Sequence, residues 1–255
     1  YNNSHAKNDL GWEMFSDTIS NPNMLITTIE TSVSPANVVY LGTKYKKIYK
    51  IDNANIGDPS LLELTSPLTG SNSYVYDIAV NPVNADEVLV VYSNYSVYSL
   101  FHSIDGGQNW NKIAGNLEQN ASGSGNGPSC RSAKIIPLGN DTLYLVGTSV
   151  GLFGTANLDG QNTVWKQVAD QEIGAVVIET LTYRAIDGLL VVGTHGNGIF
   201  QTNLTSANDL LSGVESLKVK NLEMNIYPNP VTHSVNVEFT LKTNSQVNLH
   251  LYDEL

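Results

Sequence analysis

An apolar segment that ends in Gly-Thr, or in a dipeptide aligned with it, recurs about every fifty residues along the 255-residue chain. The four copies are VVYLGT, VLVVYS, LYLVGT and LLVVGT, which begin at Val38, Val88, Leu143 and Leu189. The alignment places Tyr92 of the second copy where the others have glycine, at Gly42, Gly147 and Gly193. Such a period indicates a repeat architecture in which each repeat is one structural unit.

Each segment is followed by a short turn and a second strand-like run, namely KIYKI, VYSLFHS, GLFGTAN and GIFQTN. Alternating patterns and β-branched residues dominate, whereas no stretch carries apolar residues at helical spacing over three turns. The 13 tyrosines and 21 glycines suit pleated strands joined by tight turns. Four strands in each repeat are typical of a β-propeller blade, so the sequence predicts an all-β fold of this class.

The predicted propeller covers residues 1–204, with blades over residues 18–66, 74–115, 130–170 and 175–204. The last blade has three strands. About four blades are therefore expected, as part of a larger ring; the alternative is a compact four-bladed ring closed by residues 11–17 (GWEMFSD) on the last blade. The chain begins at Tyr1 without a signal peptide, so we expect a longer secreted protein with that peptide upstream.

A turn motif lies between the last two predicted strands of the second and third blades, as SIDGGQNW and, more weakly, NLDGQNTVW. An Asp can hydrogen-bond the turn backbone, glycines supply positive φ angles, and a Trp buries its ring in the next strand. The motif resembles the Asp-box of the bacterial neuraminidase-type (BNR) repeat of sialidases, sortilin-like receptors and xyloglucanase-like propellers. That resemblance implies a fold element remote from the active site, formed by Ser103, Asp105, Gly106, Gly107, Trp110, Asp159, Gly160 and Trp165.

The C-terminal part carries a second motif. After a polar linker over residues 205–224, residues 226–230 read IYPNP, and residues 235–239 and 247–251 alternate as two strands. The segment 225–255 resembles the start of the C-terminal sorting domain of the type IX secretion system of Bacteroidetes, with its motif at Tyr227, Pro228, Asn229 and Pro230. The resemblance implies a truncated β-sandwich, a type IX secretion partner and a secreted or cell-surface location.

One face of the propeller is expected to hold ligands. Because successive strands run antiparallel, the turns between second and third strands share a face with the blade-to-blade loops, opposite the Asp-box turns. The resemblance places ligands on that face, where the sequence offers Tyr45, Tyr95, His195 and Asn197. Tyrosine rings and amides suit stacking on and hydrogen bonding to a sugar, and they suit a protein partner equally.

Catalysis is the alternative function. A sialidase resemblance requires three arginines around the substrate, and the chain has two, Arg131 and Arg184, so sialidase activity is not expected. A xyloglucanase-like glycoside hydrolase requires two opposed carboxylates, and the loops offer Glu118, Asp170 and Glu172. We expect a carbohydrate- or protein-binding module rather than a complete enzyme, with a fragment of a xyloglucanase-like hydrolase as the alternative.

Composition excludes other classes. The formal net charge is −11, which disfavours nucleic-acid binding because phosphate recognition requires clustered basic side chains. The single cysteine, Cys130, is expected to be a small buried side chain. No run of apolar residues is long enough to span a membrane, and the five histidines show no metal-ligand spacing, so no metal or cofactor is expected.

Overall fold

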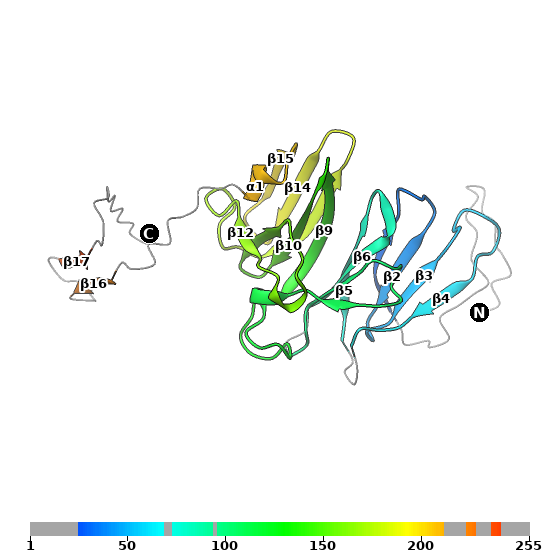
Figure 1. Ribbon diagram of the computed structural model, residues 1–255, viewed down its shortest axis with the longest axis horizontal. Coiled ribbons are helices and arrows are strands. Elements are labelled where there is room, and N and C mark those ends of the chain that lie inside the picture. Colours follow the sequence, from blue (N-terminus) through cyan, green and yellow to red (C-terminus); the bar gives the residue numbers. More distant parts are fainter. Residues whose placement is uncertain (1–24, 69–72, 94–95, 212–222, 228–235, 241–255) are drawn as a thin grey trace. The chain divides into compact units, whose positions relative to one another are not determined.

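The structure is a computed structural model that describes residues 25–68, 73–93, 96–211, 223–227 and 236–240. It divides into two compact units, Tyr1–Gly213 and Val214–Leu255. The first unit contains four antiparallel sheets in chain order, three with four strands and a last one with three (Figure 1). The predicted all-β fold built from propeller blades is therefore confirmed.

Each sheet is a meander in which consecutive strands pair. Blade 1 contains β1 (Ile26–Thr31), β2 (Val39–Thr43), β3 (Ile48–Ile51) and β4 (Leu61–Leu64). Blade 2 contains β5 (Val75–Asn81), β6 (Asn84–Tyr92), β7 (Leu100–Ser103) and β8 (Asn111–Lys112). Blade 3 contains β9 (Cys130–Leu138), β10 (Asp141–Thr148), β11 (Gly151–Thr155) and β12 (Lys166–Val168). Blade 4 contains β13 (Ile178–Arg184), β14 (Leu189–Thr194) and β15 (Ile199–Asn203).

The first strand of each blade contacts the first strand of the next, so that β1, β5, β9 and β13 follow one another along a common inner side. The apolar core lies between the sheets: one cluster joins blades 1 to 3 and a second joins blades 3 and 4. Short 3₁₀ turns, Gly115–Leu117 and Gly160–Asn162, lie in the connecting segments. Because each sheet buries a face against its neighbour, the blades stabilise one another.

The glycine of the Gly-Thr dipeptide makes room for the following blade. A Cβ atom built at Gly42 would lie 2.8 Å from Cβ of Val75, and one built at Gly147 would lie 2.6 Å from Cγ2 of Ile178. Val75 and Ile178 are the first residues of the innermost strands of the next blades, β5 and β13. The repeated glycine is therefore required by packing between blades rather than by a turn.

The pairing between the first and second strands of each blade corrects the sequence alignment of the second repeat. Thr28 pairs with Gly42, Ser132 with Gly147 and Thr180 with Gly193. The equivalent residue Asp77 pairs with Val91, so Val91 rather than Tyr92 stands at the glycine position. The blade that packs there begins with Cys130, which is completely buried, as is Val91. Blade 2 therefore carries a valine where the other blades have glycine, and Cys130 is the buried side chain that the sequence predicted.

The threonine of the dipeptide closes the turn between second and third strands. The hydroxyl of Thr43 donates to the carbonyl oxygen of Lys47 at 3.0 Å, and that of Thr148 donates to Gly151 at 2.8 Å. The hydroxyl of Thr194 donates to Gly198 at 2.6 Å. Each bond satisfies a backbone carbonyl across the turn. The equivalent residue of blade 2, Tyr92, instead donates its phenol hydroxyl to the carbonyl of Lys46 in blade 1.

Asp105 organises the SIDGGQNW turn between β7 and β8. Its Oδ1 accepts hydrogen bonds from the backbone N–H groups of Gln108 and Asn109 at 3.0 and 2.9 Å, and from the hydroxyl of Ser103 at 2.8 Å. These donors stabilise the charged carboxylate and lower the pKa of Asp105 to about 2. Gly106 and Gly107 adopt φ angles of 72° and 87°, which explains both glycines.

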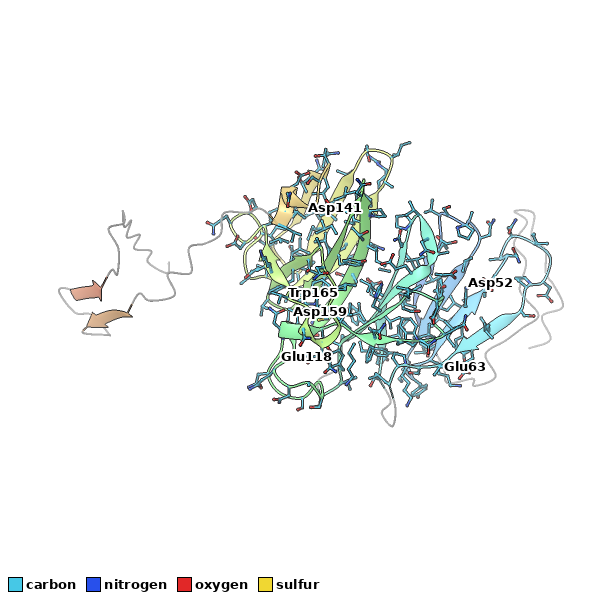
Figure 2. All side chains as sticks on the ribbon, viewed as in Figure 1. Asp52, Glu63, Glu118, Asp141, Asp159 and Trp165 are labelled. Atoms are coloured by element: carbon cyan, nitrogen blue, oxygen red, sulfur yellow. The ribbon has the colours of Figure 1, made fainter. Side chains whose placement is uncertain are left out.

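The tryptophan that follows each turn joins neighbouring blades. The indole N–H of Trp110 donates to the carbonyl of Thr65 at 3.0 Å, and that of Trp165 donates to the carbonyl of Ile113 at 2.8 Å. Trp165 is buried, whereas Asp159 in the preceding turn is exposed; both residues are labelled in Figure 2. In that turn Asp159 makes no side-chain cap, and the hydroxyl of Thr163 donates to the carbonyl of Gly160 instead.

The end of the first unit packs onto its core. Leu204 and Ala207, on either side of the predicted start of the linker, are buried with the core of blades 3 and 4, and α1 (Asn208–Leu211) follows. In the second unit, β16 (Glu223–Tyr227) pairs antiparallel with β17 (Asn236–Thr240), which overlaps the predicted strand 235–239. Several predicted features lie outside the described residues, namely the closing segment 11–17, Tyr95, Pro228, Asn229, Pro230 and the strand 247–251.

No helix in the described part of the chain is long and apolar enough to cross a membrane.

The contact at Gly42 predicts a specific energetic coupling. Gly42→Ala forces a methyl group against Val75, and overpacking of this kind costs about 1–3 kcal/mol in unfolding free energy. In a Val75→Ala background the closest clash, with Cγ1 of Val75, is removed, while the contacts with Cβ of residue 75 and with Thr28 remain. The same substitution then costs less, so urea denaturation of both single variants and the double variant measures a favourable coupling. Additive losses would contradict the packing role of the glycine.

Candidate functional site

A β-bulge recurs near the start of every innermost strand. In each blade one residue of this strand is left over between two paired neighbours, and these residues are Thr27, Tyr76, Arg131 and Glu179. The bulge breaks the alternation of the strand and re-aims the extra side chain. All four lie at the end where the turns between second and third strands are found, which is the face that the sequence predicts for ligands.

Three of the bulge residues meet. Nη1 of Arg131 donates to both carboxylate oxygens of Glu179, at 2.9 and 3.0 Å, and the hydroxyl of Tyr76 donates to Oε2 of Glu179 at 3.3 Å. Nδ1 of His195, in the turn between β14 and β15, lies 3.6 Å from Oε1 of the same carboxylate. We call these four residues the inner-mouth cluster. It joins blades 2, 3 and 4 through one carboxylate.

The inner-mouth cluster remains open to solvent. The side chains of Arg131 and Glu179 are each about one-third exposed, and the imidazole of His195 is mostly exposed. Nε of Arg131 is buried and makes no hydrogen bond among the described residues. The cluster therefore presents a partly exposed tyrosine ring beside a guanidinium, a carboxylate and an imidazole, all within reach of a ligand that approaches this face.

A polar layer lies next along the inner strands. Oδ2 of Asp77 accepts the backbone N–H of Ala133 at 2.9 Å, and Oδ1 accepts that of Ile78 at 2.9 Å. Burial raises the pKa of Asp77 to about 6, against the opposing effects of these hydrogen bonds and of Lys134. Farther along, Nζ of Lys134 pairs with Glu30 of blade 1 at 3.1 Å. These contacts tie blades 1, 2 and 3 together and serve the fold.

The residues predicted for ligand binding lie in separate turns. Tyr45 is half-buried between β2 and β3, with Nζ of Lys44 5.6 Å from its ring centre. Asn197 lies between β14 and β15 and donates through Nδ2 to the carbonyl of Ile173 at 3.2 Å. The structure brings His195 to the inner-mouth cluster, and it describes no position for Tyr95.

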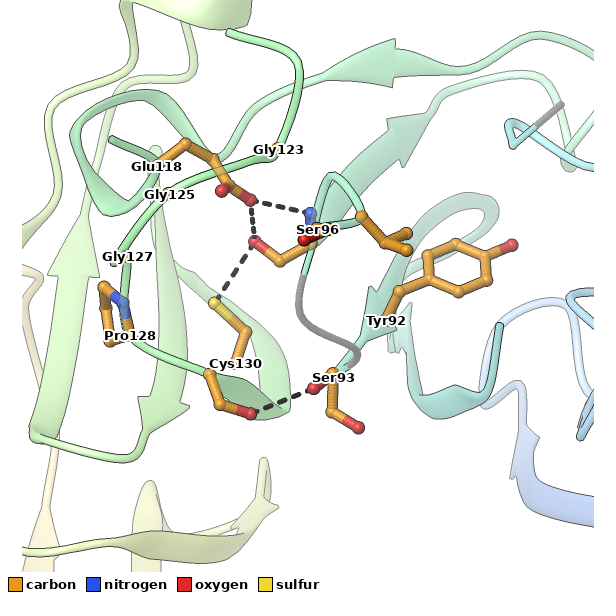
Figure 3. Close-up of a pocket in the computed structure, with 12 residues that line it drawn as sticks. Tyr92, Ser93, Ser96, Glu118, Gly123, Gly125, Gly127, Pro128 and Cys130 are labelled. Carbon is orange, nitrogen blue, oxygen red and sulfur yellow. Dashed lines mark hydrogen bonds between the residues drawn. The ribbon is translucent and has the colours of Figure 1, made fainter. Parts of the chain in front are cut away.

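Glu118 lines a small pocket between the β6–β7 turn and the glycine-rich loop that precedes β9 (Figure 3). Its Oε1 accepts hydrogen bonds from the backbone N–H and the hydroxyl of Ser99, at 2.8 and 2.6 Å. Sγ of Cys130 lies 3.5 Å from the same hydroxyl, and burial raises the pKa of this thiol to about 12. Glu118 therefore anchors its loop to blade 2, and Cys130 is not an activated nucleophile.

The other two candidate catalytic acids lie elsewhere. Asp170 and Glu172 are exposed in the loop between β12 and β13, and neither lines the pocket that contains Glu118. The carboxylate of Asp170 accepts a hydrogen bond from the side-chain amide of Gln171 at 3.2 Å. Within the described ranges no group of three or more histidine, cysteine or acidic side chains is arranged to hold a metal ion. The three candidate acids are therefore not gathered in the pocket that contains Glu118.

Comparison with known proteins identifies no family. The sequence matches no protein-family model and no curated protein. Among solved structures, the Niastella koreensis GH74 enzyme has 16% identity and a TM-score of 0.49, over 70% of this chain and 28% of that one. YCF48 bound to D1 peptide has 19% identity and a TM-score of 0.43, over 72% of this chain and 60% of that one. The chain spans less than two thirds of either, and neither likeness carries an argument about function.

The buried carboxylate of Asp77 predicts a pH-dependent effect. The pKa of Asp77 in the folded state, about 6, lies above its usual value of 3.8, so the folded state binds the proton more tightly. The stability that this group contributes therefore falls as the pH rises between these two values. Asp77→Asn loses an acceptor for one backbone N–H and destabilises the protein at pH 4. We expect the deficit to shrink by on the order of 2 kcal/mol at pH 7 in urea denaturation. A constant deficit would contradict the raised pKa.

Proposed function

We propose that this propeller is a binding module that holds a carbohydrate or peptide ligand over the inner-mouth cluster. The observation that carries the proposal is the repeated bulge, which directs Tyr76, Arg131 and Glu179 from three blades to one point beside His195. Functional side chains on rigid strands are held more accurately than those on loops. Bulges are also over-represented next to functional sites.

The chemistry of the cluster supports a polar ligand with a flat face. A tyrosine ring offers an apolar surface, while the guanidinium, carboxylate and imidazole offer donors and acceptors for hydroxyl or amide groups. The Arg131–Glu179 pair is partly exposed, and such pairs contribute about 0–1 kcal/mol, so a ligand rearranges it at little expense. Tyr45 and Asn197, in the turns of blades 1 and 4, belong to the same face and extend it for a longer ligand.

Binding to this face is tested with a glycan array that includes xyloglucan oligosaccharides and with a random peptide library. For whichever probe binds the chain, we expect Tyr76→Ala to weaken affinity at least about tenfold, or 1.4 kcal/mol, because it removes the aromatic surface. Isothermal titration calorimetry measures the change.

The matched control is Val83→Ala, which removes an exposed apolar side chain from the turn between β5 and β6, at the opposite end of the strand that carries Tyr76. This variant is expected to bind like the unaltered protein. Equal affinity of the Tyr76→Ala variant would contradict the proposed site. Release of reducing sugar from xyloglucan, abolished by Glu118→Gln, Asp170→Asn or Glu172→Gln, would favour the alternative of a glycoside hydrolase.

We further propose that the protein is exported by type IX secretion to the cell surface or the medium, with the C-terminal unit as its sorting signal. The support is the IYPNP sequence of residues 226–230 and the strand predicted after it. A fluorescent reporter with a periplasmic signal peptide, fused to the C-terminal region from residue 205 to the natural end of the protein, is expected outside the outer membrane of a competent host.

Cell fractionation measures the location of the reporter, and a host that lacks the type IX translocon is the control. A reporter that stays in the periplasm of the competent host would contradict this route. Loss of export in a Tyr227→Ala, Pro228→Ala variant would assign the signal to the motif.

A further inference from the structure

The first blade exposes an apolar residue that every later blade buries. Val75, Cys130 and Ile178 begin the innermost strands of blades 2, 3 and 4, and each is completely buried. Ile26 holds the same register position in blade 1 and is 54% exposed. Ile29, three residues along the same strand, is 62% exposed, whereas its counterparts are buried. Those counterparts are Ile78, Ala133 and Leu181.

The fourth blade exposes the other half of the same interface. Gly193 stands at the position where Gly42 receives Val75 and Gly147 receives Ile178. A Cβ atom built at Gly193 would have only one neighbour within 4 Å among the described residues, and that neighbour, Thr180, belongs to the same blade. Ile199, which pairs with Gly193, is 77% exposed. The residues that pair with this position in blades 1 to 3 are all buried, and they are Ile48, Leu100 and Leu152.

These two faces are complementary, since one offers the residue that fills the space left by the other. Within one copy they do not meet: no described residue of blade 1 approaches the position built at Gly193, and Ile26 stays more than half exposed. Exposed apolar surface of this kind marks an interaction site. The interface that would form already exists twice in the chain, at Gly42 with Val75 and at Gly147 with Ile178.

We propose that two copies of this chain associate head to tail, with Ile26 of each copy packed against Gly193 of the other. A head-to-tail contact generates a ring when its rotation closes. The described residues form four blades, so two copies bring together about eight, which is within the range of known propellers. Two identical contacts then close the ring and bury both exposed faces.

Disulfide cross-linking of the 255-residue chain tests the contact and its direction. In the existing interface, the position built at Gly42 lies 2.8 Å from Cβ of Val75, so cysteines at equivalent positions need only a small displacement to form a disulfide. Cys130 is buried, and the raised pKa of its thiol keeps it unreactive. An oxidised mixture of the Ile26→Cys and Gly193→Cys variants is expected to yield a covalent dimer of 27.6 kDa chains, and neither variant alone is expected to do so.

The association itself is measured by sedimentation equilibrium. Ile26→Asp is expected to raise the dissociation constant of the dimer at least tenfold, because it places a charge in the contact. The matched control Val83→Asp alters a similarly exposed apolar side chain on blade 2 and is expected to leave the constant unchanged. Circular dichroism confirms that both variants are folded.

Two results would overturn the proposal. If the Ile26→Cys, Gly193→Cys double variant forms its disulfide within one chain and stays monomeric, the four blades close on themselves. If the mixture of single variants gives no cross-link and the unaltered chain sediments as a monomer, other segments cover the two faces or both stay open.

Discussion

Contact between successive blades is the interaction on which the rest of the structure depends. The first residue of an innermost strand packs where the preceding blade carries a glycine, as Val75 does at Gly42 and Ile178 at Gly147. In blade 2 the glycine position carries Val91, and blade 3 begins with the smaller Cys130; both side chains are completely buried. In the two glycine pairs the larger residue occupies the space that the glycine leaves, as close packing of the interior requires. A sheet alone would leave one apolar face in water, so stability resides in the series of blades rather than in any single one.

The candidate site is a direct consequence of this contact. The residue after each packed position is the bulge residue, which leaves the ladder and turns away from the interface between blades. Packing between blades therefore places the first residue of the strand in the core, and the bulge places the next residue in the inner-mouth cluster. Tyr76, Arg131 and Glu179 differ in chemistry, yet all three are positioned by the same backbone feature, the β-bulge. Ligand chemistry can thus vary from blade to blade while the scaffold stays constant.

The repeat was sufficient to predict the blades because the Gly-Thr dipeptide and the Asp105 turn are local signals. Of the inner-mouth cluster the sequence predicted His195 alone. The three bulge residues share no chemistry, and their common register is visible only in the pairing of the strands. A four-residue pattern was nevertheless present at each site: ITTI, VYDI, CRSA and IETL, in which a polar pair separates two residues that are apolar or small. Similarly, Glu118 resembled a free loop acid, and only its contact with Ser99, distant in sequence, shows that it is an anchor.

Because a threonine hydroxyl closes three of the turns between second and third strands, the shape of these turns does not depend on the residues within them. The hydroxyls of Thr43 and Thr194 reach a carbonyl four residues later, whereas that of Thr148 reaches one three residues later. The residues between are not needed to close the loop, and they read KYK, SV and HGN. Mutations there can accumulate during evolution without loosening the sheet beneath. The face proposed to meet ligands can thereby exchange its turns, and acquire new specificities, while the sheets beneath stay unchanged.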